Sequence, residues 1–126
     1  MSIKFTVIKK GNSLNPKAPK KYYATIVSDG KTQLDDLAKY ATETSSVSKA
    51  DVLAVLESVF TKIAIDVADG KSVYVGDYFS LRASGSSIGS EHPEDVSGKN
   101  IKTVRTIFKP GKLIKNALKL ATFKRK

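Results

Sequence analysis

The sequence has no cysteine, no tryptophan and a single histidine, His92, among its 126 residues. Without cysteine there is no disulfide framework, no thiol nucleophile and no thiolate metal site. One histidine does not make a zinc ligand set, and it leaves little scope for histidine-based acid–base catalysis. Two pairs of adjacent acidic residues, Asp35 with Asp36 and Glu94 with Asp95, have no nucleophile and no glycine-rich phosphate loop beside them. We therefore expect a protein that is not an enzyme and that uses no metal, no cofactor and no small-molecule substrate.

Long hydrophobic runs are also missing, because no apolar stretch approaches the roughly 20 residues that span a bilayer. The first residues, Met1 to Phe5, lack the basic and then apolar order of a secretory signal. An apolar fraction of 40% is sufficient for one modest core. These features predict a soluble, cytoplasmic protein with no membrane partner.

Acidic residues are absent from residues 99–126, which carry ten Lys or Arg. Residues 1–31 hold seven lysines and one aspartate. Between them, residues 32–70 hold three lysines and seven acids, and residues 71–98 hold two basic and four acidic residues. The net charge of +10 is thus concentrated at the two ends of the chain. Segregated positive charge favours a polyanionic partner such as nucleic acid, and an ordinary solvated basic surface is the alternative.

Two segments near the start have the pattern of β-strands. Residues 3–9 alternate apolar and polar side chains, and residues 22–27 have high β-propensity. Gly, Asn and Pro between them favour a loop, so we predict a β-hairpin extension at residues 1–30. Five lysines in and beside this loop form either a second basic patch for nucleic acid or a solubilising surface: Lys9, Lys10, Lys17, Lys20 and Lys21.

Two helices are predicted next in the chain. Thr32 is placed to cap the first helix, which has apolar residues at helical spacing. Ser48 followed by Asp51 is typical of the start of a second helix, and Gly70 is placed at its end. The second helix is apolar over more than a narrow stripe. One small chain offers few partners for such a surface, so the pattern favours dimerisation.

The remaining chain alternates between strand-like and polar segments. Residues 72–81 predict two strands joined by a turn, and residues 83–98 become rich in Ser, Gly and acids, which predicts a flexible excursion. Residues 99–108 alternate again and predict a returning strand. Pro110 is suited to the first position of a last helix, which is followed by a basic tail at residues 123–126.

This order of elements, from Lys31 to Lys119, resembles that of the bacterial HU/IHF family of histone-like DNA-binding proteins. Three short matches carry the resemblance: KTQL at residues 31–34, VGDYFSL at residues 75–81 and FKPGK at residues 108–112. The first 30 residues look like the N-terminal β extension of a longer subgroup of these proteins. The resemblance therefore covers most of the chain.

The resemblance implies an α+β fold for residues 31–126, with two N-terminal helices, a three-stranded antiparallel sheet with a projecting β arm at about residues 83–99, and a C-terminal helix. It also implies an intertwined homodimer, with a heterodimer with a paralogue as the alternative. In this family a proline at the arm tip wedges between base pairs, and Pro93 matches it in position. Here the residues beside it are acidic. Pro93 is therefore either the wedge or an exposed loop residue.

Phosphate contacts are expected near the base of the arm and at the start of the last helix. Lysine and arginine side chains and the free N–H groups at a helix start all bind phosphate oxygens. For the lysines and arginine of the returning strand, ordinary solvated positions are the alternative. Tyr22, Tyr23 and Tyr78 either pack against neighbours or stack on unpaired bases. The expected DNA-binding residues are Arg82, Lys99, Lys102, Arg105, Lys109, Lys112 and Lys115.

The sequence thus predicts an architectural, largely sequence-nonspecific binder of double-stranded DNA. Such a protein would be nucleoid-associated and would condense DNA, with bending by the arm. Two alternatives remain open. One is a structural or protein-interaction module that keeps the HU fold without wrapping DNA, and the other is a binder of single-stranded nucleic acid or RNA.

Overall fold

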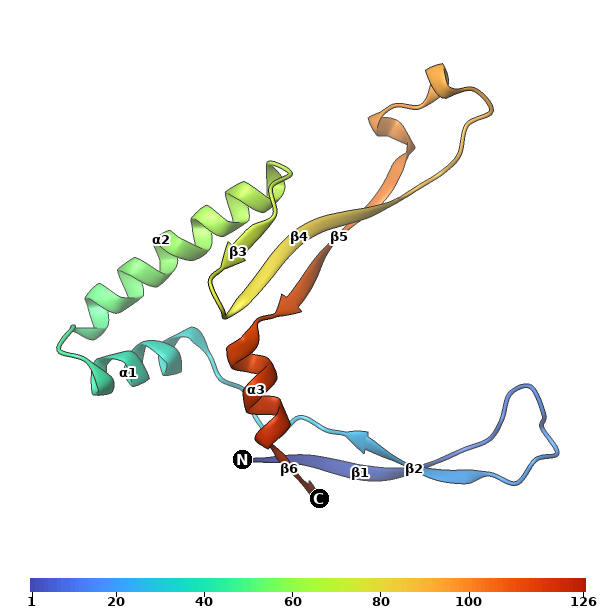
Figure 1. Cartoon of the computed structure of the whole chain (residues 1–126), viewed down its shortest axis with the longest axis horizontal. Coiled ribbons are helices and arrows are strands. Elements are labelled where there is room, and N and C mark those ends of the chain that lie inside the picture. Colours follow the sequence, from blue (N-terminus) through green and yellow to red (C-terminus); the bar gives the residue numbers. More distant parts are fainter. The chain divides into compact units, whose positions relative to one another are not determined.

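A computed structural model describes all residues from Met1 to Lys126 and shows three helices and two three-stranded sheets (Figure 1). The α+β class predicted from the sequence is confirmed. The chain forms two compact units. Unit 1 consists of residues 1–33 and 117–126, and unit 2 consists of residues 34–116. The two units are described in turn.

Unit 1 is built on an antiparallel hairpin of strands β1 (Ser2–Lys10) and β2 (Lys21–Ile26). The register places Phe5 opposite Ile26 at one end and Lys10 opposite Lys21 at the other. A ten-residue excursion, residues 11–20, joins the strands at the lysine end. The hairpin predicted for this region is therefore present.

A third strand completes this sheet from the far end of the sequence. Strand β6 (Thr122–Arg125) pairs in parallel with β1, so that the sheet has the order β2-β1-β6. The hydroxyls of Ser2 and Thr122 lie 2.8 Å apart, and the Lys126 amide donates to the Phe5 carbonyl. The prediction of a basic tail here was incomplete, because four residues carry no local pattern strong enough to indicate a strand.

Unit 2 begins with helices α1 (Leu34–Thr44) and α2 (Lys49–Ala68). The Ser48 hydroxyl caps α2 as predicted, since it accepts a hydrogen bond from the Asp51 amide. Gly70 follows α2 with a φ of 86°, a conformation that suits glycine at the end of a helix. Helix α1 begins later than a cap at Thr32 requires, so that prediction was wrong by about one residue.

The second sheet has the order β3-β4-β5, from β3 (Val73–Val75), β4 (Phe79–Ser87) and β5 (Ile101–Pro110), all antiparallel. Strand β4 runs to Ser87, well into the segment for which the sequence predicted a flexible excursion. Serine and glycine have low β-propensity, and here the pairing with β5 overrides it. In Figure 1 the β4–β5 pair extends beyond β3 as an arm.

Helix α3 (Lys112–Leu120) follows β5. Pro110 is the last residue of β5, opposite Phe79, rather than the first residue of the helix as predicted. Gly111 between them lies against the β3–β4 turn: its amide donates to the Tyr78 carbonyl at 2.7 Å. A Cβ at position 111 would lie 2.1 Å from the Asp77 carbonyl oxygen, so no larger residue fits this backbone.

The arm ends in two 3-10 turns, Pro93–Asp95 and Gly98–Asn100. The buried Asn100 organises this tip, because its side chain donates to the Ile88 carbonyl and to the Ser90 hydroxyl and accepts from the Ser97 amide. The segment predicted to be a flexible excursion thus has defined turns and hydrogen bonds at its end.

The single chain has almost no closed core. Ala38 and Asn100 are its only buried residues, and Val55 and Ile65 of α2 are 60% and 58% exposed. Between α2 and the β4–β5 pair lies an open cavity of about 480 Å³, lined by apolar side chains that include Phe60, Leu81 and Val104. Much of the apolar surface of α2 therefore has no partner within the chain.

Candidate nucleic-acid interface

The β3–β4–β5 sheet has two chemically different faces. Residues directly opposite one another on antiparallel strands share a face. One face carries Val75, Phe79, Leu81 and Phe108, and the Phe79 and Phe108 ring centroids lie 5.6 Å apart. Because Leu81 lines the cavity beside α2, this apolar face is the one toward the helix. The opposite face carries both polar and apolar side chains, of which Ser80, Ser84 and Ile107 are half-buried.

Three of the predicted DNA-binding residues lie on the opposite face. The register pairs Arg82 with Ile107, Ser84 with Arg105 and Ser80 with Lys109, which places Arg82, Arg105 and Lys109 on one side of the ribbon. Arg82 and Lys109 do not line the cavity beside α2, whereas Arg105 is one of its lining residues. The pairing of β4 and β5 thus brings together residues that are more than 20 positions apart in the sequence.

Lys102 and Lys99 lie farther along the arm. The register shifts between Ser86 and Ser87, whose partners are Thr103 and Ile101, so the pairing skips Lys102. Such a bulge redirects a side chain relative to regular alternation. Lys99 lies in the 3-10 turn before β5, where its amide donates to the Ser97 hydroxyl. The prediction that Lys99 belongs to the returning strand was therefore wrong.

Lys112 and Lys115 lie in the first turn of α3 and are exposed. The ion pairs of the chain join Lys4 to Asp29, Lys49 to Asp35 and Lys62 to Asp66. None of them involves a predicted DNA-binding residue. The seven candidate cations of unit 2 are therefore available to an external anion.

The arm tip has the opposite charge. Pro93 begins an exposed 3-10 turn, and Glu91, Glu94 and Asp95 around it are all exposed. Their carboxylates take part in none of the ion pairs. The tip thus carries three acidic side chains and one candidate cation, Lys99 of its second turn, whereas Arg82, Arg105 and Lys109 lie toward the base of the arm.

The second basic patch predicted from the sequence lies at the loop end of the β1–β2 hairpin. Lys10 lies directly opposite Lys21, and the Lys9 ammonium is 5.6 Å from the centroid of the Tyr22 ring. A hollow of about 550 Å³ opens beside this pair of lysines. It is lined by Lys10, Gly11, Asn12, Ser13, Ala18, Pro19, Lys21 and Tyr23.

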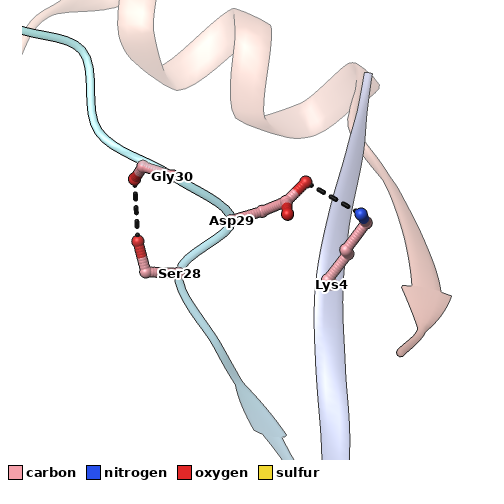
Figure 2. A network of polar contacts seen from close by, with 4 residues as sticks. All are labelled: Lys4, Ser28, Asp29 and Gly30. Carbon is pink, nitrogen blue, oxygen red and sulfur yellow. Dashed lines mark hydrogen bonds and ion pairs between the residues drawn. The ribbon is translucent and has the colours of Figure 1, made fainter.

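The only acidic side chain of unit 1 is Asp29, which lies at the other end of the hairpin. Figure 2 shows it beside Lys4. Asp29 is 2.9 Å from the Lys4 ammonium. The hydrogen bond and the positive charge of Lys4 lower the pKa of Asp29 below its ordinary value. Ser28 stabilises the same turn, because its hydroxyl donates to the Gly30 carbonyl. This carboxylate therefore neutralises Lys4 and none of the lysines at the loop end.

Two further findings concern metal ions and membranes. No group of three or more His, Asp or Glu side chains is placed to hold a metal ion. None of the helices has the length and the apolar character that a membrane span requires.

The sequence did not indicate the structural roles of two residues. Asn100 orders the arm tip, and Gly111 allows the segment before α3 to lie against the β3–β4 turn. The FKPGK match pointed to Gly111 without giving the reason.

Comparison with known families gives one match over nearly the whole chain. The family HU-HIG, described as an HU domain fused to a wHTH, Ig or glycine-rich motif, matches residues 1–125. No curated protein matches the sequence.

Two solved structures share the fold. One is a protein from Bacteroides vulgatus described provisionally as a bacterial DNA-binding protein: the TM-score is 0.71 and the identity 10%, over 98% of this chain and 48% of that one. The other is HU from Anabaena, crystallised with DNA: the TM-score is 0.54 and the identity 22%, over 69% of this chain and 97% of that one. The chain spans about half the length of the Bacteroides protein.

Proposed function

The chain belongs to the HU-HIG family, HU domains fused to a wHTH, Ig or glycine-rich motif, and from this premise we propose that it binds double-stranded DNA. Binding is architectural and largely independent of sequence, and it makes the protein a nucleoid-associated, histone-like component of a bacterial cytoplasm. The observation that carries the proposal is the set of unpaired cations on the β4–β5 pair and the start of α3. The fold shared with the Anabaena HU that was crystallised with DNA supports it.

Electrostatic attraction to phosphates is the proposed source of affinity. Arg82, Arg105 and Lys109 share one face of the β4–β5 pair by register, and Arg105 also borders the cavity beside α2. Lys112 and Lys115 are near the start of α3, where free backbone N–H groups also favour an anion. Phosphate contacts fix the position of a protein on DNA without reading its sequence. This arrangement fits condensation of DNA better than recognition of one site.

We further propose that the functional form is a homodimer. The apolar side chains of α2 that the single chain leaves exposed, such as Val55 and Ile65, need a cover that a second copy supplies. An exposed apolar surface of this extent on a soluble protein marks an interface. Two copies also double the number of cations available to one duplex, which strengthens binding by counterion release.

The acidic arm tip favours one other candidate function. Exposed Glu91, Glu94 and Asp95 repel phosphates, and a tip of this charge suits contact with a basic protein. In that case the HU fold serves as a protein-interaction module, and Pro93 is an exposed turn residue rather than a wedge. This candidate predicts no dependence of function on the basic residues of β5 and α3.

The test is a fluorescence-anisotropy titration of labelled duplex DNA of about 30 base pairs at several salt concentrations. If about six phosphates are neutralised per dimer, the logarithm of the binding constant falls against the logarithm of salt with a slope near −5. The Arg105→Glu/Lys112→Glu variant should bind roughly 10-fold more weakly. A Lys39→Glu/Lys71→Glu variant, with the same change of charge at exposed lysines of α1 and the α2–β3 connection, is the control.

Two results would contradict the proposal. The first is no duplex binding at low salt, which would favour the protein-interaction module. The second is equal binding by the Arg105→Glu/Lys112→Glu variant and its control, which would remove the site from β5 and α3. An excess of unlabelled single-stranded DNA that displaces the duplex more effectively than unlabelled duplex would instead favour the binder of unpaired strands.

A further inference from the structure

The net charge of the chain lies entirely in one of its two units. Unit 1, residues 1–33 and 117–126, holds eleven Lys or Arg and a single acid, Asp29. Unit 2, residues 34–116, holds eleven basic and eleven acidic residues. The appended sheet therefore carries the whole excess of +10, whereas the HU-like unit has no net charge. Long-range attraction of a polyanion is consequently strongest toward unit 1.

The loop end of the hairpin concentrates this charge at a point where it opposes folding. Lys10 and Lys21 lie directly across the β1–β2 pair, and like charges in that position destabilise a sheet. Lys9 and Lys20 flank the pair in the sequence. The one acidic side chain of the unit, Asp29, is paired with Lys4 at the opposite end of the hairpin. Nothing within unit 1 neutralises the loop end, and an external anion would relieve the repulsion.

The hollow at this end has the polar groups that an anion needs. Lys10 and Lys21 line it together with Asn12, Ser13 and Tyr23. The Asn12 carbonyl oxygen of the side chain accepts from the Leu14 amide, which leaves the side-chain NH₂ as a donor. The side chains thus offer two ammonium groups, an amide NH₂ and two hydroxyls. The volume of about 550 Å³ is in the usual range of small-ligand sites.

We propose that this hollow binds the phosphodiester backbone of duplex DNA, as a contact separate from the one on β5 and α3. Two lysines facing one another hold a phosphate between them, and the amide and hydroxyl groups hydrogen-bond its oxygens. Each chain then carries two DNA-contacting surfaces on two different units. The choice of DNA as the source of the phosphodiester rests on the proposed function, whereas the anion site itself rests on unit 1 alone.

The experiment uses the full chain in three variants with equal changes of charge, assayed by anisotropy on duplex DNA. Lys10→Glu/Lys21→Glu alters the hollow, Arg105→Glu/Lys112→Glu alters the HU-like surface, and Lys39→Glu/Lys71→Glu is the control. We expect the hollow variant to bind duplex DNA roughly 5- to 10-fold more weakly than the control. The magnitude of its salt slope should fall by about one for each chain in the complex, because one phosphate contact per chain is lost. Residual binding of the Arg105→Glu/Lys112→Glu variant should disappear when Lys10→Glu/Lys21→Glu is added.

The neutral variant Lys10→Gln/Lys21→Gln guards against misfolding, because it removes the charges and the repulsion together and should melt at or above the temperature of the wild type. This neutral variant should still bind duplex DNA more weakly than the wild type. Equal binding by the hollow variants and the control overturns the inference and leaves the proposed function in place. Loss of binding on altering the hollow, with none on altering Arg105 and Lys112, supports the inference and overturns the proposed site of unit 2.

Discussion

At the scale of single residues, a few positions are fixed by backbone geometry or by a charge rather than by side-chain packing. Gly111 is the clearest case, because the backbone of the β3–β4 turn occupies the space where its Cβ would be. Asn100 is another, since its amide joins three segments of the arm tip. Asp29 is the third, because the ammonium group of Lys4 pairs with its carboxylate. Two of these residues give testable predictions.

Gly111→Ala should destabilise the protein by about 2–3 kcal/mol, because the added methyl group forces the segment before α3 away from Asp77. Chemical denaturation followed by circular dichroism measures the change. Gly98→Ala is the matched control: nothing lies within 4 Å of a Cβ there, so its free energy of unfolding should stay within about 0.5 kcal/mol of the wild type. Equal effects of the two substitutions would show that the close approach at Gly111 does not matter.

The lowered pKa of Asp29 predicts that the stability of the β1–β2 hairpin depends on pH. A carboxyl whose folded pKa is below its unfolded pKa stabilises the fold above the unfolded pKa, and this contribution is lost as the pH falls through the folded pKa. The β1–β2 hairpin should therefore open more readily in acid. Lys4→Gln should raise the pKa of Asp29 toward its ordinary value, since Lys4 is the main cause of the shift. An NMR titration of the Asp29 carboxyl carbon measures it, and an unchanged midpoint would refute the assignment.

At the scale of elements, the arm is divided into a basic base and an acidic tip. The base gains its charge from Arg82 and Arg105 on paired strands, and the tip gains its charge from Glu91, Glu94 and Asp95. Because these carboxylates are exposed and make no ion pairs, they oppose approach of the tip to DNA. The proposal of DNA binding thus assigns the affinity to the base.

Neutralising the tip should strengthen DNA binding. Glu91→Gln/Glu94→Gln is expected to raise the affinity for duplex DNA roughly 3-fold at low salt, with a smaller gain at high salt because the repulsion is screened. Anisotropy titration measures it. Glu43→Gln/Glu57→Gln on α1 and α2 has the same change of charge at exposed sites and controls for the overall field. Weaker binding by the tip variant would mean that these carboxylates take part in the complex.

At the scale of the whole molecule, the exposure of α2 in a single chain is the main indicator of a homodimer. A monomer with only Ala38 and Asn100 buried would have little hydrophobic stabilisation to offset its loss of conformational entropy. The proposed dimer supplies the missing burial. In this proposal the free energy of unfolding depends on the contacts between two chains rather than on those within one.

Val55→Asp tests the dimer directly. Val55 is 60% exposed in one chain, so a monomer should tolerate the change, whereas a dimer that buries it should lose about 2–3 kcal/mol per chain. Thr61→Asp, also exposed on α2, is the control. Sedimentation equilibrium gives the mass, and the melting temperature of the wild type should rise with protein concentration. A monomeric mass at all concentrations would exclude the homodimer.

The sequence by itself determined most of the local structure. The alternation of β1 and β5, the Ser48 cap and Gly70 all depend on residues close to one another in the chain, and such patterns are readable without a fold. The basic residues of the candidate site were also visible as charge without neighbouring acid. The broad apolar surface of α2 was also visible in the sequence, and residues such as Val55 and Ile65 are exposed in the single chain.

Only the tertiary structure decided what depends on contacts between distant residues. The pairing of β6 with β1 joins residues about 120 positions apart. The four residues of β6 are too few to show the alternation that predicts a strand. Gly111 and Asn100 owe their roles to backbone atoms brought near by the β4–β5 pair. The grouping of Arg82 with Arg105, and of Lys10 with Lys21, follows from strand register. Register sets which side chains share a face, and a one-residue shift would reverse it.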